Sequence, residues 1–313
     1  MREHLAAPGG DHDSLDRGDG RRPACADDVG FVETCVLSAI AADDPDDPIG
    51  ASALLFLIRL YQLTGREDLA GSVGNALASA LARADHGSTV IDRASWLGLL
   101  VETRALSDDD RVSAAIELLI DQLRDAWVSS CVADAATAVE ACLLAAGLPE
   151  HRALASDAID GMERVIAANY RPGAGVGAFV DQVRAASALL TAYALSGRLP
   201  YPMLAEELMQ IAGRGAGDFT GSCEAARVFC RLAALHDEAD YCRAAVVTPG
   251  ADYRRDAAQM LAAQAEEARR RGAAAAIYGV ALLELESAGP TSLESARSTG
   301  PRSSTPQILK SSD

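Results

Sequence analysis

The chain is poor in lysine, in aromatic residues and in long apolar runs. Lys310 is its single lysine, and aromatic residues make up 4% of the sequence. The remaining alanine- and leucine-rich composition favours helices and argues against a β-rich fold. The longest apolar run covers residues 49–58 and ends at Arg59, so it is too short to span a bilayer. The N-terminus carries acids and glycines where a signal peptide is apolar, which predicts a cytoplasmic protein without a membrane partner.

Positive charge is also scarce. The sequence has 28 Lys and Arg residues against 45 Asp and Glu residues, which gives a formal net charge of −17. Such a chain repels phosphate backbones and anionic lipids, so we expect no nucleic-acid partner, whereas a neutral or cationic peptide meets no such barrier. Seven cysteines, an odd number scattered through the chain, predict free thiols packed as small apolar side chains rather than a disulfide framework.

Composition divides the chain into three parts. Residues 1–28 are rich in Gly, Asp and Arg, and residues 289–313 are rich in Ser, Thr and Pro, which predicts disordered tails at both ends. Between them, in residues 29–288, apolar side chains recur at helical spacing, as in Leu54, Leu57 and Ile58. This central part is therefore expected to be one helical domain.

The predicted helix ends recur at a regular interval. Successive turns are marked by Gly65, Ser107, Gly147, Gly197 and Asp237, with separations of 42, 40, 50 and 40 residues. A period near forty is typical of helical hairpins stacked side by side. The first helix of each pair begins with small residues, which allow the close approach that an inner layer needs. We therefore predict an all-α fold, an α/α toroid (barrel) of about six helical hairpins, with an open solenoid as the alternative.

Residues 48–57, followed by 60–65, resemble the opening inner helix of lanthionine synthetase C-like cyclases. The stretches 96–106, 134–145 and 185–197 resemble successive units of the same toroid. The resemblance implies a protein of a ribosomal peptide natural-product pathway that binds a modified precursor peptide in its central cavity. It also implies a second possible partner, a dehydrating or other modifying enzyme.

The zinc site of that family is lost in this chain. Family members hold zinc with two cysteines and a histidine, whereas Phe219 stands at the position that resembles the first cysteine. The nearest approach to the second cysteine motif is Cys242-Arg243-Ala244, and Asp181-Gln182 replaces the His-Gly pair. We therefore expect no metal and no cofactor. Two roles remain open, zinc-independent thioether cyclisation and non-catalytic binding.

Two acids and two arginines are the candidate site residues. Asp181 and Glu224 open consecutive inner helices, so in a closed ring both carboxylates could face one end of the cavity as the catalytic pair. Arg184 and Arg227 lie three residues further on and are the candidate substrate-binding residues. The structural alternative is that acids in a first turn stabilise the helix dipole and that each arginine pairs with its own helix.

Two other function classes remain open. One is a carbohydrate-active α/α toroid of the epimerase or glycosidase type, although Trp96 and Trp127 supply few platforms for stacking a sugar. The other is a structural helical-repeat scaffold. A melting transition raised by sugar would indicate the first.

Overall fold

A computed structural model describes residues 24–42, 49–82, 89–129, 131–246 and 248–288. Most of the predicted tails, residues 1–23 and 289–313, lie outside this range. The helix α1 begins at Ala24, so residues 24–28 belong to the folded domain rather than to the tail in which we placed them.

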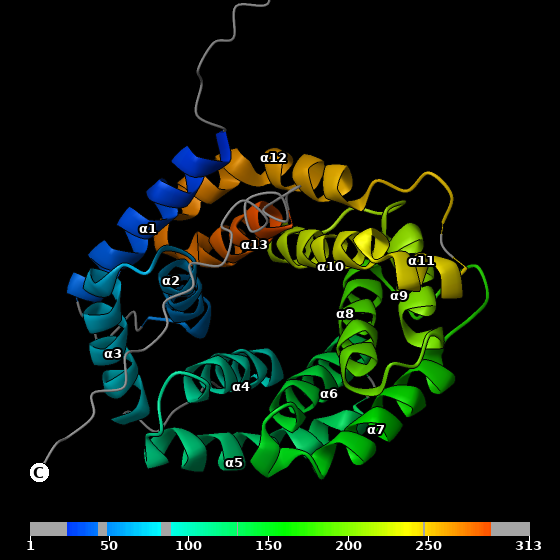
Figure 1. Cartoon of the computed structure of the whole chain (residues 1–313), viewed down its shortest axis with the longest axis horizontal. Coiled ribbons are helices and arrows are strands. Elements are labelled where there is room, and N and C mark those ends of the chain that lie inside the picture. The colour runs from blue at the N-terminus through cyan, green and yellow to red at the C-terminus, as the bar shows by residue number, and fades with distance from the viewer. Residues whose placement is uncertain (1–23, 43–48, 83–88, 130, 247, 289–313) are drawn as a thin grey trace, which may run out of the picture.

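The described helices form two concentric layers (Figure 1). The inner layer consists of α2 (Ala51–Thr64), α4 (Val90–Arg104), α6 (Val132–Ala146), α8 (Phe179–Ser196), α10 (Phe219–Asp237) and α13 (Ala276–Ser287). The outer layer consists of α1 (Ala24–Ala42), α3 (Glu67–Ala82), α5 (Asp110–Arg124), α7 (Leu154–Asn169), α9 (Pro200–Ala212) and α12 (Tyr253–Arg271). The short helix α11 (Ala239–Ala244) lies between α10 and α12 along the chain.

The ring is closed. Each inner helix contacts the next, and α13 contacts both α10 and α2, so the last inner helix completes the circle with the first. Closure needs a close approach at Gly279 of α13, because a Cβ atom there would lie 2.7 Å from the Phe56 ring and 2.9 Å from Val32. The buried carboxylate of Asp28 adds polar contacts from Arg269 and from the Tyr278 hydroxyl. The predicted α/α toroid is therefore confirmed, and the solenoid alternative is wrong.

Local sequence explains where several helices begin and end. Gly65 and Gly197 adopt left-handed backbone conformations, with φ of +66° and +68°, and end α2 and α8 as glycine does at helix C-termini. Thr89 and Asp92 form a reciprocal capping box at the start of α4, and Asp109 caps α5. Gly65 and Gly197 are two of the turn markers predicted from the sequence, whereas the capping box of Thr89 and Asp92 was not among the predicted turns.

The core lies between the two layers. On the outer helix α5, the buried residues recur at helical spacing along one face: Val112, Ala115, Ile116, Leu119, Ile120 and Leu123. Inner helices are buried on most sides, and in α6 nearly every buried residue is small or β-branched. Small side chains let neighbouring inner helices approach closely, which leaves larger polar side chains free to extend from the inner layer into the lumen.

Among the described residues, no helix combines the length and the apolar character needed to traverse a bilayer.

Candidate functional site

The lumen of the toroid is crossed by a belt of charged side chains, which we call the lumen belt: Arg59, Glu102, Glu140, Arg227, Arg231 and Glu284. They come from α2, α4, α6, α10 and α13, and α8 adds the hydroxyls of Ser187 and Thr191. Residues four apart lie on the same face of a helix, so the pairs 227/231 and 187/191 both point inward. The belt therefore draws on all six inner helices.

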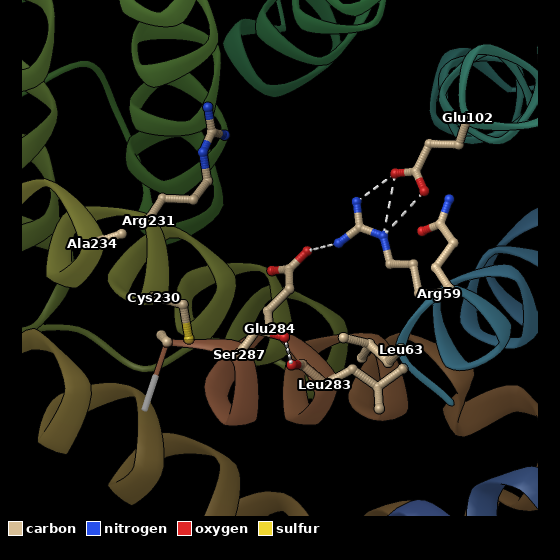
Figure 2. Close-up of a pocket in the computed structure, with 11 residues that line it drawn as sticks. Arg59, Leu63, Glu102, Cys230, Arg231, Ala234, Leu283, Glu284 and Ser287 are labelled. Carbon is tan, nitrogen blue, oxygen red and sulfur yellow. Dashed lines mark hydrogen bonds and ion pairs between the residues drawn. The ribbon is translucent and has the colours of Figure 1, made fainter. Parts of the chain in front are cut away.

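One half of the belt is organised around Glu284 (Figure 2). The Nε of Arg227 donates to the two Glu284 oxygens at 3.1 and 3.0 Å, and Arg59 donates to the same carboxylate through a terminal nitrogen. The Nε of Arg59 also donates to Glu102 at 3.2 and 3.3 Å. Burial alone would raise the pKa of Glu284, but the charges of Arg227 and Arg59 outweigh it and hold the pKa below its usual range.

The other half of the belt is organised around Glu140. Its Oε1 atom accepts hydrogen bonds from Ser187 Oγ at 2.6 Å and Thr191 Oγ1 at 3.0 Å. Arg231 lies 3.2 Å from the same oxygen and also donates to both hydroxyl oxygens, at 3.0 and 2.9 Å. Helices α6 and α10, which α8 separates, are thus joined across the lumen.

A cavity of about 530 Å³ opens beside the belt, at the C-terminal ends of the inner helices. Arg59, Glu102, Arg231 and Glu284 line its polar side (Figure 2). Leu63, Leu283 and Ala234 line its apolar side. Two arginines and two glutamates cancel in charge, so this cavity offers fixed hydrogen-bond donors and acceptors without a net charge. That suits a neutral polar ligand of small-molecule size.

Three of the four predicted site residues, Asp181, Arg184 and Glu224, lie nearer the opposite end of the inner helices, whereas Arg227 belongs to the lumen belt. Asp181 accepts hydrogen bonds from the backbone amides of Ala133 at 3.0 Å and Ala178 at 2.8 Å, so it ties α8 to the start of α6. Glu224 is paired with Arg184, whose Nε and Nη2 atoms donate to its oxygens at 3.0 and 3.2 Å. These contacts agree with the structural alternative for Asp181. The catalytic role of Asp181 and Glu224 stays a prediction.

The expected pairing of each arginine with its own helix did not occur. Arg184 of α8 pairs with Glu224 of α10, and Arg227 of α10 pairs with Glu284 of α13, because side chains on inner helices meet across the lumen. We predicted no site role for the other members of the belt from the sequence. The sequence feature that could have identified them is a charged residue inside a helix of otherwise apolar or small residues, as at Arg59 and Glu284.

The described thiols include both buried and exposed groups. Cys142, Cys223 and Cys230 are buried, and burial raises the pKa of each to about 12. All described cysteines with placed side chains are free thiols, as expected from the sequence, but Cys131 and Cys242 are exposed and are not packed as the small apolar side chains that we predicted. Within the described parts of the chain, no three His, Cys, Asp or Glu side chains gather closely enough to hold a metal ion.

A second buried carboxylate lies outside the lumen, where α9, α10 and α12 meet. Glu206 is 2% exposed. Its oxygens accept hydrogen bonds from the hydroxyls of Tyr241 at 2.9 Å and Tyr253 at 3.0 Å. They also accept from the amide and the hydroxyl of Thr248, at 3.2 and 3.0 Å. The Nε2 atom of His236 lies 2.7 Å from it. We call these five residues the Glu206 cluster. Burial raises the pKa of Glu206, but these hydrogen bonds outweigh it and lower the pKa overall.

No protein-family model and no curated protein sequence matches this chain. Solved structures do match. The GH76A α-1,6-mannanase from Salegentibacter sp. superposes with a TM-score of 0.60 at 12% identity, over 83% of this chain and 99% of that chain. An inactive double-aspartate variant of this mannanase in complex with α-1,6-mannotetrose gives a TM-score of 0.59 at 13% identity, over 82% and 98% of the two chains.

These similarities correct the family that we inferred from sequence. The resemblance to lanthionine synthetase C-like cyclases, and with it the function in a ribosomal peptide pathway, is contradicted by matches to mannanases. The motifs behind that resemblance were small residues and Gly-containing turns. Any toroid needs such residues for close helix packing and helix termination, so these motifs indicate the fold but not the reaction. The precursor-peptide partner is untested and stays a prediction. At the level of its fold, the chain is similar to the α/α toroid of α-1,6-mannanases.

Proposed function

We propose that this toroid binds a neutral carbohydrate in the cavity beside the lumen belt. The observation that carries the proposal is the cavity's polar lining, in which Arg59, Glu102, Arg231 and Glu284 present donors and acceptors held in place by ion pairs. Sugar hydroxyls both donate and accept hydrogen bonds, so they match such a lining. The fold similarity to mannanases, one solved with α-1,6-mannotriose and another with α-1,6-mannotetrose, supports the same ligand class.

The geometry favours binding over hydrolysis. Glycoside hydrolysis usually needs one carboxyl group with a raised pKa to protonate the leaving oxygen and a second carboxylate as base or nucleophile. Here Glu102, Glu140 and Glu284 are each ion-paired with an arginine, and the pKa of Glu284 is lowered. With its pKa lowered by two arginines, Glu284 is a poor proton donor at neutral pH.

The distribution of aspartates points the same way. The mannanase variants solved with ligand are inactive and carry replacements of two adjacent aspartates. The six described inner helices of this chain contain no two adjacent aspartates. Asp27 and Asp28 belong to the outer helix α1, and Asp108 to Asp110 lie at the start of the outer helix α5. None of these five residues lines the cavity.

Calorimetric titration with α-1,6-mannotriose tests the proposal, alongside incubation with α-1,6-mannotetrose and analysis of products. We expect saturable binding and an intact tetrasaccharide. Ala234→Trp should abolish binding, because Ala234 is exposed at the cavity and the added ring fills it without breaking an ion pair. Ala114→Trp, at an exposed alanine of the outer helix α5, is the matched control and should bind like the unmodified chain.

Absence of sugar-dependent heat, or equal binding by both tryptophan variants, would refute the proposal. Release of shorter saccharides would replace the binding role with a hydrolytic one. In that case Asp181→Asn and Glu224→Gln test whether the catalytic pair expected from sequence supplies the activity.

A further inference from the structure

Exposed leucines stand one helical turn beyond the lumen belt, toward the C-terminal ends of the inner helices. Leu63 follows Arg59 by four residues, Leu144 follows Glu140, and Leu195 follows Thr191. Residues four apart share a helix face, so these leucines border the same lumen. They are 55%, 42% and 38% exposed. We call these three residues the leucine collar.

The collar is not part of the apolar core. Leu235, which follows Arg231 by four residues on α10, is half-buried and packs against the core cluster, whereas the three collar leucines do not. Leu63 lines the lumen cavity together with the buried Leu283. The C-terminal opening of the lumen therefore changes, over about one helical turn, from paired charges to apolar side chains.

We propose that the ligand of this site is amphipathic, with a neutral sugar head in the lumen belt and an aliphatic chain along the leucine collar, as in a neutral alkyl glycoside or glycolipid. This inference rests on the proposed function. A bare oligosaccharide would leave Leu63 facing water or hydroxyl groups, whereas an aliphatic chain removes apolar surface on both partners from water.

The charge balance selects the head group. The four charged side chains of the cavity are two arginines and two glutamates, each already ion-paired, so an ionic head group would meet no net countercharge there. The net charge of −17 adds a repulsive field for anionic head groups. A neutral polyhydroxylated head avoids both costs.

The test compares methyl α-mannoside with octyl α-mannoside on the full chain, by calorimetry below the concentration at which the octyl compound forms micelles. We expect the octyl compound to bind at least about tenfold more tightly, because part of its chain is buried against leucine side chains. In the double variant Leu144→Ser/Leu195→Ser, at the two collar leucines that do not line the cavity, this advantage should fall to about twofold or less, with the affinity for the methyl compound unchanged.

Leu118→Ser is the matched control. Leu118 is 48% exposed on the outer helix α5, away from the lumen, so the octyl advantage should persist in this variant. An equal loss in the control would assign the effect to non-specific adsorption and overturn the inference.

The remaining outcomes separate the two proposals. If both mannosides bind equally well, the amphipathic ligand is wrong while the carbohydrate site stands; if neither mannoside nor mannotriose binds, both proposals fail. If sedimentation detects a dimer that the collar variant dissociates, the collar is the contact of a second copy of the chain and the inference is overturned.

Discussion

The lumen belt and the Glu206 cluster are two ways of burying carboxylates in one toroid. In the belt, arginines neutralise Glu102, Glu140 and Glu284, and a cavity lies beside them. In the cluster, Glu206 accepts its hydrogen bonds from two tyrosines, a threonine and a histidine, and it does not line that cavity. A fully satisfied carboxylate without adjoining space holds helices together, whereas paired charges that border a cavity can also meet a ligand.

The comparison predicts that stability depends most on the cluster. Glu206→Gln should lower the free energy of unfolding by about 3 kcal/mol, because an amide replaces one acceptor oxygen with a donor that faces the hydroxyls of Tyr241, Tyr253 or Thr248. Urea unfolding at neutral pH measures this. Glu266→Gln, at an exposed position of α12, should change the value by less than about 0.5 kcal/mol. Equal effects of the two substitutions would contradict a structural role for the cluster.

The belt should show the opposite balance between stability and binding. Glu284→Gln should lower the free energy of unfolding by about 1–2 kcal/mol, because Arg59 keeps Glu102 as a partner and the Arg227 side chain is 29% exposed, so water can solvate it. The same substitution should weaken mannotriose binding, which Glu206→Gln should leave unchanged. Paired urea unfolding and calorimetry check both halves of this prediction. Weaker sugar binding in the cluster variant than in the belt variant would reverse the assignment.

Lowering the pH should reduce the contribution of both Glu206 and Glu284 to the free energy of unfolding. The folded-state pKa values of Glu206 and Glu284 are lowered, so below the ordinary glutamate pKa of about 4.3 the unfolded chain takes up protons that the folded chain does not. The stabilisation is present above that pH and is lost as the pH falls through the folded-state values. The stability gap between the unmodified chain and Glu206→Gln should therefore narrow as urea midpoints are taken from about pH 7 to about pH 3. A gap that stays constant would indicate that the carboxylate is already protonated in the fold.

Features that depend on neighbouring residues were predictable. Gly65 and Gly197 end their helices as expected, because a left-handed residue at a helix C-terminus is a local requirement that glycine meets at low cost. The inner helices could be recognised by their small residues, since close packing in a ring needs them. Every toroid needs small residues on its inner helices, so their presence could not distinguish one toroid family from another. This explains why the family that we inferred from the sequence was wrong.

The candidate cavity could not be read from sequence in the same way. Asp181 and Glu224 attracted attention because they open helices, yet Asp181 binds backbone amides and Glu224 binds Arg184. Arg59 and Glu284 form an ion pair although they are 225 residues apart in the sequence. A pattern over neighbouring residues cannot predict such a contact.

An all-helical chain, several of its helix ends and the repeat that makes a toroid can be predicted from the residues alone, because they follow from propensity, capping and apolar spacing over a few residues. Which charged side chains share the lumen and which thiols are buried depends instead on how the helices pack in three dimensions. Ring closure brings α13 against α2, and the partner of each belt residue depends on that long-range contact rather than on the residues beside it.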